Sequence, residues 1–214
     1  MNIIAIDTST QFCSVSLSKN NVIYTITEDL PRQHNERLLN MIDEVLTLAS
    51  VNKSNLGLIA YGRGPGSFVG VRLSAAVVQA MAYVLNCPVV GFSSLSAIAH
   101  QVFWTHHVNR ITVLLDARMG DAYVGYFEFD DSGRLLSVDE CCQEIDSIDT
   151  QPSDLIVGDR IAGCNMEIDI DHYCPDTQFM FPEILSYYHE HPQVVSTEVL
   201  PVYLQGLKNW KKLT

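Results

Sequence analysis

The sequence lacks several motifs that mark catalytic or metal-binding proteins. None of its seven histidines forms an HxxxH pair, the helical spacing at which two imidazoles bind one metal ion. Its six cysteines form no CxxC motif, and no G-x-S-x-G motif marks a serine nucleophile. None of its twelve glycines is adjacent to another, so no Gly-Gly loop can receive an adenosine. The sequence therefore predicts no catalytic residue, no metal site and no cofactor.

Basic residues are also scarce. The chain has 13 Lys and Arg residues against 25 Asp and Glu residues, a formal net charge of -12 at pH 7. Binding to nucleic acid depends on clustered cations, so we expect the chain alone to be repelled by it. The one basic cluster consists of Lys208, Lys211 and Lys212 around Trp210. Any role on RNA therefore requires a basic partner.

The sequence shows no targeting segment. The N-terminus begins with a strand-like run and has neither the basic n-region nor the apolar h-region of a signal peptide. The longest apolar segment, Val71–Leu85, is shorter than a membrane span. We therefore expect a cytoplasmic protein with reduced thiols and no membrane association.

The first half begins with strands and continues with alternating helices and strands. Apolar or alternating runs bounded by turn residues predict strands, and longer apolar-periodic segments predict helices. In chain order the predicted segments are strands 3–7, 13–18 and 22–28, helix 34–50, strand 58–61, helix 71–85, strand 89–92 and helix 94–103. This order predicts a mixed sheet with helices on its faces.

The second half repeats the start of the first. Ile111–Leu115 is an apolar run that precedes Asp116, just as a similar run ends in Asp7. In both halves a valine, Val15 or Val124, follows the aspartate by eight residues, which indicates an internal duplication. The further predicted segments are strands 122–129 and 155–158, a helix near 182–189 and a short C-terminal helix. We expect two α/β subdomains, 1–105 and 106–199, with 200–214 packing back on the first.

The most informative stretch is glycine-rich. Residues 62–72 read Gly-Arg-Gly-Pro-Gly-Ser-Phe-Val-Gly-Val-Arg and lie between a predicted strand and a predicted helix. A helix N-terminus after a glycine turn offers unbonded N–H groups to an anion, which favours a nucleotide loop. Glycines also allow a tight turn that packs a helix on a sheet. The stretch is neither a Walker loop, since no Lys follows the glycines, nor G-x-G-x-x-G.

Two aspartates end strands in front of turns. Asp7 and Asp116 occupy equivalent places in the two halves. Paired carboxylates that face one ligand can hold Mg²⁺ through water or act as a base. The alternative is that each caps its own turn by accepting backbone N–H bonds.

Two predicted helices are apolar over an unusually wide arc. The apolar positions of 34–50 cover about 180° of the helix, and 71–85 is apolar nearly all round, which is typical of helices covered on both sides. The second cover is either another subunit or the second half of the chain. We expect a subunit interface. Its residues are Leu38, Met41, Ile42, Val45, Gly70, Ser74, Ala75, Val78 and Ala82.

These motifs together resemble the TsaB (YeaZ) family, bacterial proteins needed for the threonylcarbamoyladenosine modification of tRNA. The matching motifs are Ile4-Ala5-Ile6-Asp7-Thr8-Ser9 with Cys13-Ser14-Val15, Gly62–Arg72, Asp116-Ala117-Arg118-Met119-Gly120, Pro201-Val202-Tyr203-Leu204 and Trp210-Lys211-Lys212. The resemblance implies a duplicated actin-like ATPase fold (ASKHA, RNase H-like), with two subdomains of mixed sheets and helices.

The resemblance also accounts for the missing chemistry. TsaB proteins are similar to the catalytic subunit TsaD, which binds metal through an HxxxH helix. Matching Pro88–Gly91 to the corresponding TsaD strand puts the two histidine positions at Ser94 and Ile98, and isoleucine cannot bind metal. Residues of a vestigial nucleotide site would be Asp7, Thr8, Ser9, Gly64, Gly66, Ser67 and Asp116.

The implied protein is a non-catalytic subunit. It forms a homodimer in isolation, binds and activates a TsaD-like subunit, and through it meets a TsaE-like ATPase and, only indirectly, tRNA. A second hypothesis is an independent ATPase or phosphotransferase that uses Asp7, Asp116 and the loop 64–70. A third, a peptidase, has no nucleophile or metal set in the sequence to support it.

Overall fold

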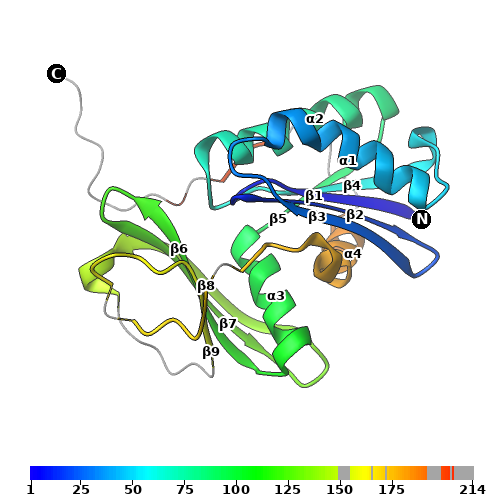
Figure 1. The fold of residues 1–214 in the computed structure, drawn as a ribbon. Coiled ribbons are helices and arrows are strands. Elements are labelled where there is room, and N and C mark those ends of the chain that lie inside the picture. The colour runs from blue at the N-terminus through cyan, green and yellow to red at the C-terminus, as the bar shows by residue number, and fades with distance from the viewer. Residues whose placement is uncertain (149–154, 165, 172, 192–198, 203, 205–214) are drawn as a thin grey trace. The chain divides into compact units, whose positions relative to one another are not determined.

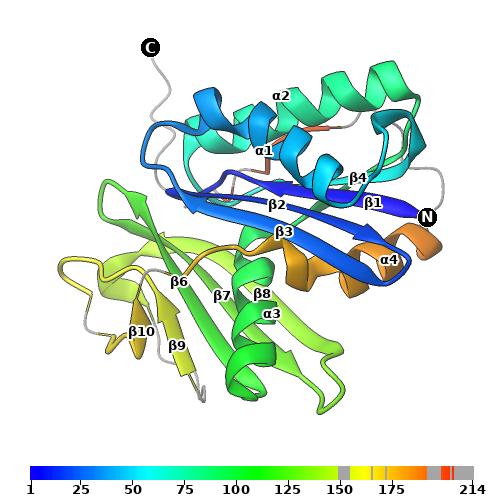
Figure 2. The same ribbon diagram turned by 45° about the vertical axis from the view of Figure 1, so that its right-hand side comes forward.

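The chain forms two compact units, each built around its own sheet (Figures 1 and 2). The computed structural model describes residues 1–148, 155–164, 166–171, 173–191, 199–202 and 204. The first unit consists of Met1–Ala97 and Cys174–Val202, and the second contains Ile98–Tyr173. The predicted C-terminal helix lies outside the described residues.

The first unit has a five-stranded mixed sheet. Its strands are β1 (Asn2–Asp7), β2 (Phe12–Lys19), β3 (Val22–Asp29), β4 (Leu56–Gly62) and β5 (Val89–Phe92). Their order in the sheet is β3-β2-β1-β4-β5. The meander β1-β2-β3 is antiparallel, and β4 and β5 are added parallel to β1.

The second unit repeats this arrangement. Its strands are β6 (Arg110–Arg118), β7 (Asp121–Phe129), β8 (Leu135–Glu144), β9 (Leu155–Gly158) and β10 (Ile170–Asp171). Their order is β10-β9-β6-β7-β8, with β6-β7-β8 antiparallel and β9 and β10 parallel to β6. Strand for strand, this is the topology of the first unit, which confirms the predicted duplication and the α/β actin-like fold class.

Helices cover both faces of the first sheet. The described residues form four α-helices: α1 (His34–Leu48), α2 (Phe68–Leu85), α3 (Ser94–His106) and α4 (Phe181–Glu190). Apolar residues of α1 and α2 share one buried cluster with Ile4, Ile6 and Ile59, so these helices lie on one face. On the other face Ile3, Ala5 and Leu58 cluster with residues of α4. Figure 2 shows α4 on the side of this sheet opposite α1 and α2.

The segment after Cys174 completes the first unit rather than the second. Thr177, in the 3-10 turn Thr177–Met180, shares hydrogen bonds with the hydroxyls of Ser14 (3.0 Å) and Ser16 (2.7 Å) on β2. Alternation along β2 directs these serines away from Cys13, Val15 and α1. The unit bounds therefore differ from the predicted division 1–105 and 106–199, because the turn and α4 pack on strands of the first sheet.

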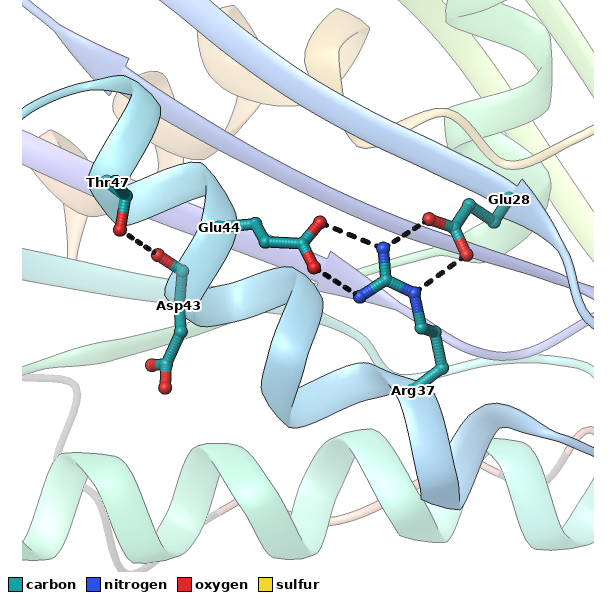
Figure 3. A network of polar contacts seen from close by, with 5 residues as sticks. All are labelled: Glu28, Arg37, Asp43, Glu44 and Thr47. Carbon is teal, nitrogen blue, oxygen red and sulfur yellow. Dashed lines mark hydrogen bonds and ion pairs between the residues drawn. The ribbon is translucent and has the colours of Figure 1, made fainter.

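A polar network ties α1 to the edge of its sheet (Figure 3). The Arg37 guanidinium donates to both carboxylate oxygens of Glu28 on β3, at 2.9 and 2.5 Å. It also donates to both oxygens of Glu44, two turns further along α1, at 2.6 and 2.8 Å. This ion pair lowers the pKa of Glu44. The network fixes the helix on the outer strand of the sheet.

Helix α2 is longer than the predicted segment 71–85. It begins at Phe68 because the Ser67 hydroxyl caps it by accepting from the N–H of Gly70 at 3.3 Å. At 18 residues it is, by length and composition alone, long and apolar enough to cross a membrane. This corrects the expectation that the apolar segment, taken as Val71–Leu85, is shorter than a membrane span. A core helix of a globular protein passes the same test, so the finding is weak evidence for a membrane span.

Candidate functional site

Asp7 is the centre of the candidate site in the first unit. It ends β1 and is completely buried. One carboxylate oxygen accepts from the backbone N–H and the hydroxyl of Ser9, both at 2.7 Å, and the other accepts from the hydroxyl of Ser94 at 2.7 Å. Burial raises the pKa of Asp7 above its ordinary value of 3.8, although these hydrogen bonds oppose the rise. The two carboxylate oxygens are thus held by protein donors.

Gly62 leaves the space that this carboxylate fills. It lies at the end of β4, the parallel neighbour of β1, and a Cβ atom there would be 1.8 Å from Oδ2 of Asp7. Its backbone is not in the left-handed region, so closeness alone requires glycine. Sequence reasoning did not single out Gly62. The signal was present, since pairing the predicted strands 3–7 and 58–61 in parallel brings residue 62 beside Asp7.

The glycine-rich loop packs directly on the turn after β1. A Cβ atom at Gly70 would lie 1.9 Å from the carbonyl oxygen of Thr8, and one at Gly66 would lie 2.4 Å from that of Ser9. The Thr8 hydroxyl donates to the carbonyl of Gly70 at 2.8 Å, and the N–H of Ser67 donates to the carbonyl of Ser9 at 2.6 Å. Of the two interpretations of this loop, the geometry matches the tight turn that packs a helix on a sheet.

The loop is also fastened to the segment that opens α3. Gly64 has φ +98°, a conformation that favours glycine, and its carbonyl accepts from the N–H of Ser94 at 3.0 Å. The N–H of Arg63 donates to the carbonyl of Phe92 at 2.9 Å, and that of Val202 donates to the carbonyl of Arg63 at 2.8 Å. Described residues of the predicted tail thus bond to the first unit.

The structure brings the predicted residues Asp7, Thr8, Ser9, Gly64, Gly66 and Ser67 into one bonded cluster. It adds Ser94, whose hydroxyl donates to Asp7 where the resemblance places a histidine in TsaD. Ile98, at the second such position, is fully buried. Within the described residues no group of three or more His, Cys, Asp and Glu side chains is arranged to hold a metal ion.

Asp116 has the equivalent place in the second unit but different surroundings. It lies near the end of β6, and its side chain is 30% exposed. One carboxylate oxygen accepts from the N–H of Arg118 at 2.7 Å, and the other lies 3.0 Å from the Arg118 guanidinium. Its own N–H donates to Asp159 at 2.9 Å. Asp116 therefore acts as the cap of its own turn, with a cation of that turn beside it.

The nine predicted interface residues are all buried within the first unit. On α1 these are Leu38, Met41, Ile42 and Val45, and on α2 they are Gly70, Ser74, Ala75, Val78 and Ala82. They face the sheet, so the assignment of these side chains to a subunit contact is wrong. The exposed face of α2 instead carries Phe68 (66% exposed), Val69 (73%), Tyr83 (82%) and Val84 (79%).

Between these ends, the exposed face of α2 is made of smaller and polar residues. Ala76 and Ala80 lie on it together with Arg72, whose guanidinium stacks on the Phe68 ring at 3.1 Å. Residues 69, 72, 76, 80 and 83 follow helical spacing and form one stripe. Two alanines in the middle of an apolar stripe allow another helix to approach closely. We call Val69, Arg72, Ala76, Ala80 and Tyr83 the α2 stripe.

Comparisons with known proteins match the chain to the TsaD family model and to proteins named TsaB and YeaZ. Residues 21–187 match the family model described as TsaD, tRNA N6-adenosine threonylcarbamoyltransferase. A Haemophilus influenzae protein named tRNA threonylcarbamoyladenosine biosynthesis protein TsaB is 30% identical over 100% of this chain and 97% of its own length. The Escherichia coli (strain K12) protein of the same name is 36% identical over 62% of this chain and 58% of that protein. The solved structure of YeaZ from Pseudomonas aeruginosa has a TM-score of 0.81 and 28% identity, and covers 95% of this chain and 99% of that one.

Proposed function

This chain belongs to the TsaB family, and from that premise we propose that it is a non-catalytic subunit in the synthesis of threonylcarbamoyladenosine in tRNA. It binds a TsaD-like catalytic paralogue in the cytoplasm and holds it in a competent state. A partner that binds only the active conformer shifts the population toward it without touching substrate. A TsaE-like ATPase and tRNA meet this subunit through the paralogue.

The observation that carries the proposal is the filled site around Asp7. A nucleotide loop works by presenting free N–H groups and an accessible carboxylate to phosphate and metal. Here the loop carries protein carbonyls against Gly66 and Gly70, and Asp7 is buried under three protein donors. A phosphate would have to displace the turn Thr8–Ser9 from the loop. This supports a scaffold over an independent ATPase or phosphotransferase.

The α2 stripe is the surface on which we place the partner. In the isolated chain its large apolar members are exposed, and covering them against another protein removes apolar surface from water. The same stripe serves a second copy of the chain when the paralogue is absent, which gives a homodimer in isolation. Paralogue and second copy then compete for one surface.

The test uses the purified chain and its TsaD-like paralogue. Ala80→Glu places a charge in the middle of the stripe, and Met119→Glu is the matched control because Met119 is 94% exposed in the second unit. We expect the wild type and Met119→Glu to form the complex in sedimentation and to support formation of the modified nucleoside, and Ala80→Glu to do neither. Nucleotide hydrolysis by the isolated chain that is lost in Asp7→Asn would instead favour the ATPase hypothesis.

A further inference from the structure

The outer strand of the second sheet has an open edge. β8 pairs with β7 along one side, and no described strand lies along its other side. Leu136–Asp139 are four consecutive exposed residues on it, with Leu136 56% and Val138 52% exposed. Proteins usually protect such edges with Lys, Pro or an inward charge, and this run has neither Lys nor Pro. We call Leu136–Asp139 the β8 edge.

The β8 edge extends the apolar layer of its sheet. Val138 lies opposite Phe127, and opposed residues in an antiparallel pair share a face. Phe127 is 3% exposed and Phe129, two residues on, lies 5.0 Å from Phe103 of α3 between ring centroids. The layer that Phe103 of α3 covers at Phe129 is therefore uncovered at Val138. A bulge leaves Leu136 without an opposite residue in β7 and adds a second exposed apolar side chain.

Most of the negative charge of the chain lies in the same unit. Residues 98–173 contain 4 Arg, no Lys and 15 Asp or Glu, a net charge of -11. The other 138 residues contain 9 basic and 10 acidic side chains, a net charge of -1. Around the β8 edge, Asp139 and Glu128 are exposed carboxylates, and Asp130 and Asp131 follow in the turn before β8. A field of one sign attracts a cationic partner and repels a second copy of this unit.

We propose that the β8 edge takes up an extended, Lys- and Arg-bearing segment of another protein as an added strand. The backbone of that segment pairs with β8, one apolar side chain covers Val138, and alternate basic side chains meet Asp139 and Glu128. This surface is separate from the α2 stripe, so the inference goes beyond the proposed function and stands or fails without it.

The test measures binding of a short fluorescein-labelled peptide of alternating lysine and valine by anisotropy. Val138→Lys is the variant at the β8 edge. Val22→Lys is its matched control, because Val22 is also 52% exposed and lies on β3, the equivalent outer strand of the first sheet. We expect Val138→Lys to weaken binding by about tenfold or more and Val22→Lys to leave it unchanged. Both side chains are exposed, so both variants should keep the wild-type melting temperature.

Two further peptides separate strand pairing from general attraction. A peptide with glutamate in place of lysine tests charge, and one with alternate N-methylated backbone amides keeps the charge but cannot pair as a strand. Neither should bind, and amide exchange of the wild type should slow at Leu136–Asp139 only with the unmodified peptide. The proposal is overturned if the N-methylated peptide binds as tightly as the unmodified one. It is also overturned if Val138→Lys and Val22→Lys lose peptide affinity equally. A dimer of the free chain that Val138→Lys dissolves would likewise overturn it and would assign the edge to a second copy.

Discussion

Replacing Gly62 with alanine tests the packing around Asp7 most directly. The added methyl group would lie 1.8 Å from Oδ2 and 2.6 Å from Cγ of Asp7, and 3.1 Å from the hydroxyl of Ser94. The carboxylate cannot turn away without breaking bonds, since three donors hold it at 2.7 Å. Overpacking of a core costs about 1–3 kcal/mol, and a lost hydrogen bond to a charged group costs about 1.5–3 kcal/mol.

We therefore expect Gly62→Ala to lower the free energy of unfolding by about 3–5 kcal/mol, a large part of the roughly 5–15 kcal/mol typical of a domain. Urea titration followed by circular dichroism measures this. Gly57→Ala is the control on the same strand, where the new methyl would lie 2.6 Å from the side chain of Met1. Met1 is 56% exposed and can move aside, so the control should change stability by no more than about 0.5 kcal/mol.

A double-mutant cycle assigns the loss to Asp7. In an Asp7→Ala background the carboxylate is gone, and Gly62→Ala should then cost at least about 1 kcal/mol less than in the wild type. Equal costs in both backgrounds would refute the packing argument, as would a Gly62→Ala variant as stable as Gly57→Ala.

Three other outcomes follow from the same contacts. The pKa of Asp7 is raised in the folded state, so folded wild type keeps the Asp7 proton at pH values where the unfolded chain, with the ordinary pKa of 3.8, has lost it. The wild type therefore has its full stability below pH 3.8 and loses part of it as pH rises through the raised pKa of the folded state. Asp7→Asn should therefore gain stability relative to the wild type from about pH 4 upward. Urea titrations at several pH values that give a constant difference between the two proteins would contradict this. At pH values above 4.5, the ordinary pKa of Glu44, Arg37→Lys should have a lower melting temperature than the wild type. This difference should shrink as the pH falls through the lowered pKa of Glu44 in the folded state and the carboxylate is protonated. A difference in melting temperature that does not depend on pH would exclude this ion pair as its cause. Ser67→Ala should lower the free energy of unfolding by about 1 kcal/mol because it removes the cap of α2, and Ser67→Asp should keep the cap and the stability. An alanine variant of wild-type stability would show that the cap contributes nothing.

The sequence predicted the elements of the first unit well because their signals are local. Apolar runs, turn residues and glycines mark β1 to β5, and the repeated aspartate pointed to the second sheet. β8 was missed, since its sequence Leu-Leu-Ser-Val-Asp-Glu-Cys-Cys-Gln-Glu is acidic and does not alternate cleanly. A strand at the edge of a sheet has little to bury, so its residues carry a weak pattern.

The direction in which a helix faces was harder to predict than its existence. The wide apolar arc of α1 and α2 indicated that both sides of each helix are covered, but not which side faces the sheet. The smallest residues of α2 were therefore assigned to a subunit interface. In the structure Gly70 and Ser74 face inward because they meet the carbonyls of Thr8 and Gly62. A substitution such as Val78→Asp would therefore unfold the first unit rather than separate subunits.

The hydrogen bonds of Ser14 and Ser16 affect when the first unit can be completed during synthesis of the chain. The residue that bonds to these serines, Thr177, leaves the ribosome long after β2, together with α4, which covers Ile3 and Leu58. At a synthesis rate of about 5–20 residues per second, the 87 residues from Ile98 to Ile184 take roughly 4–17 s. During that interval Ile3 and Leu58 lack the cover that α4 gives them in the folded protein. The unit that begins first is thus finished last, and a nascent chain arrested before residue 174 presents these side chains to chaperones.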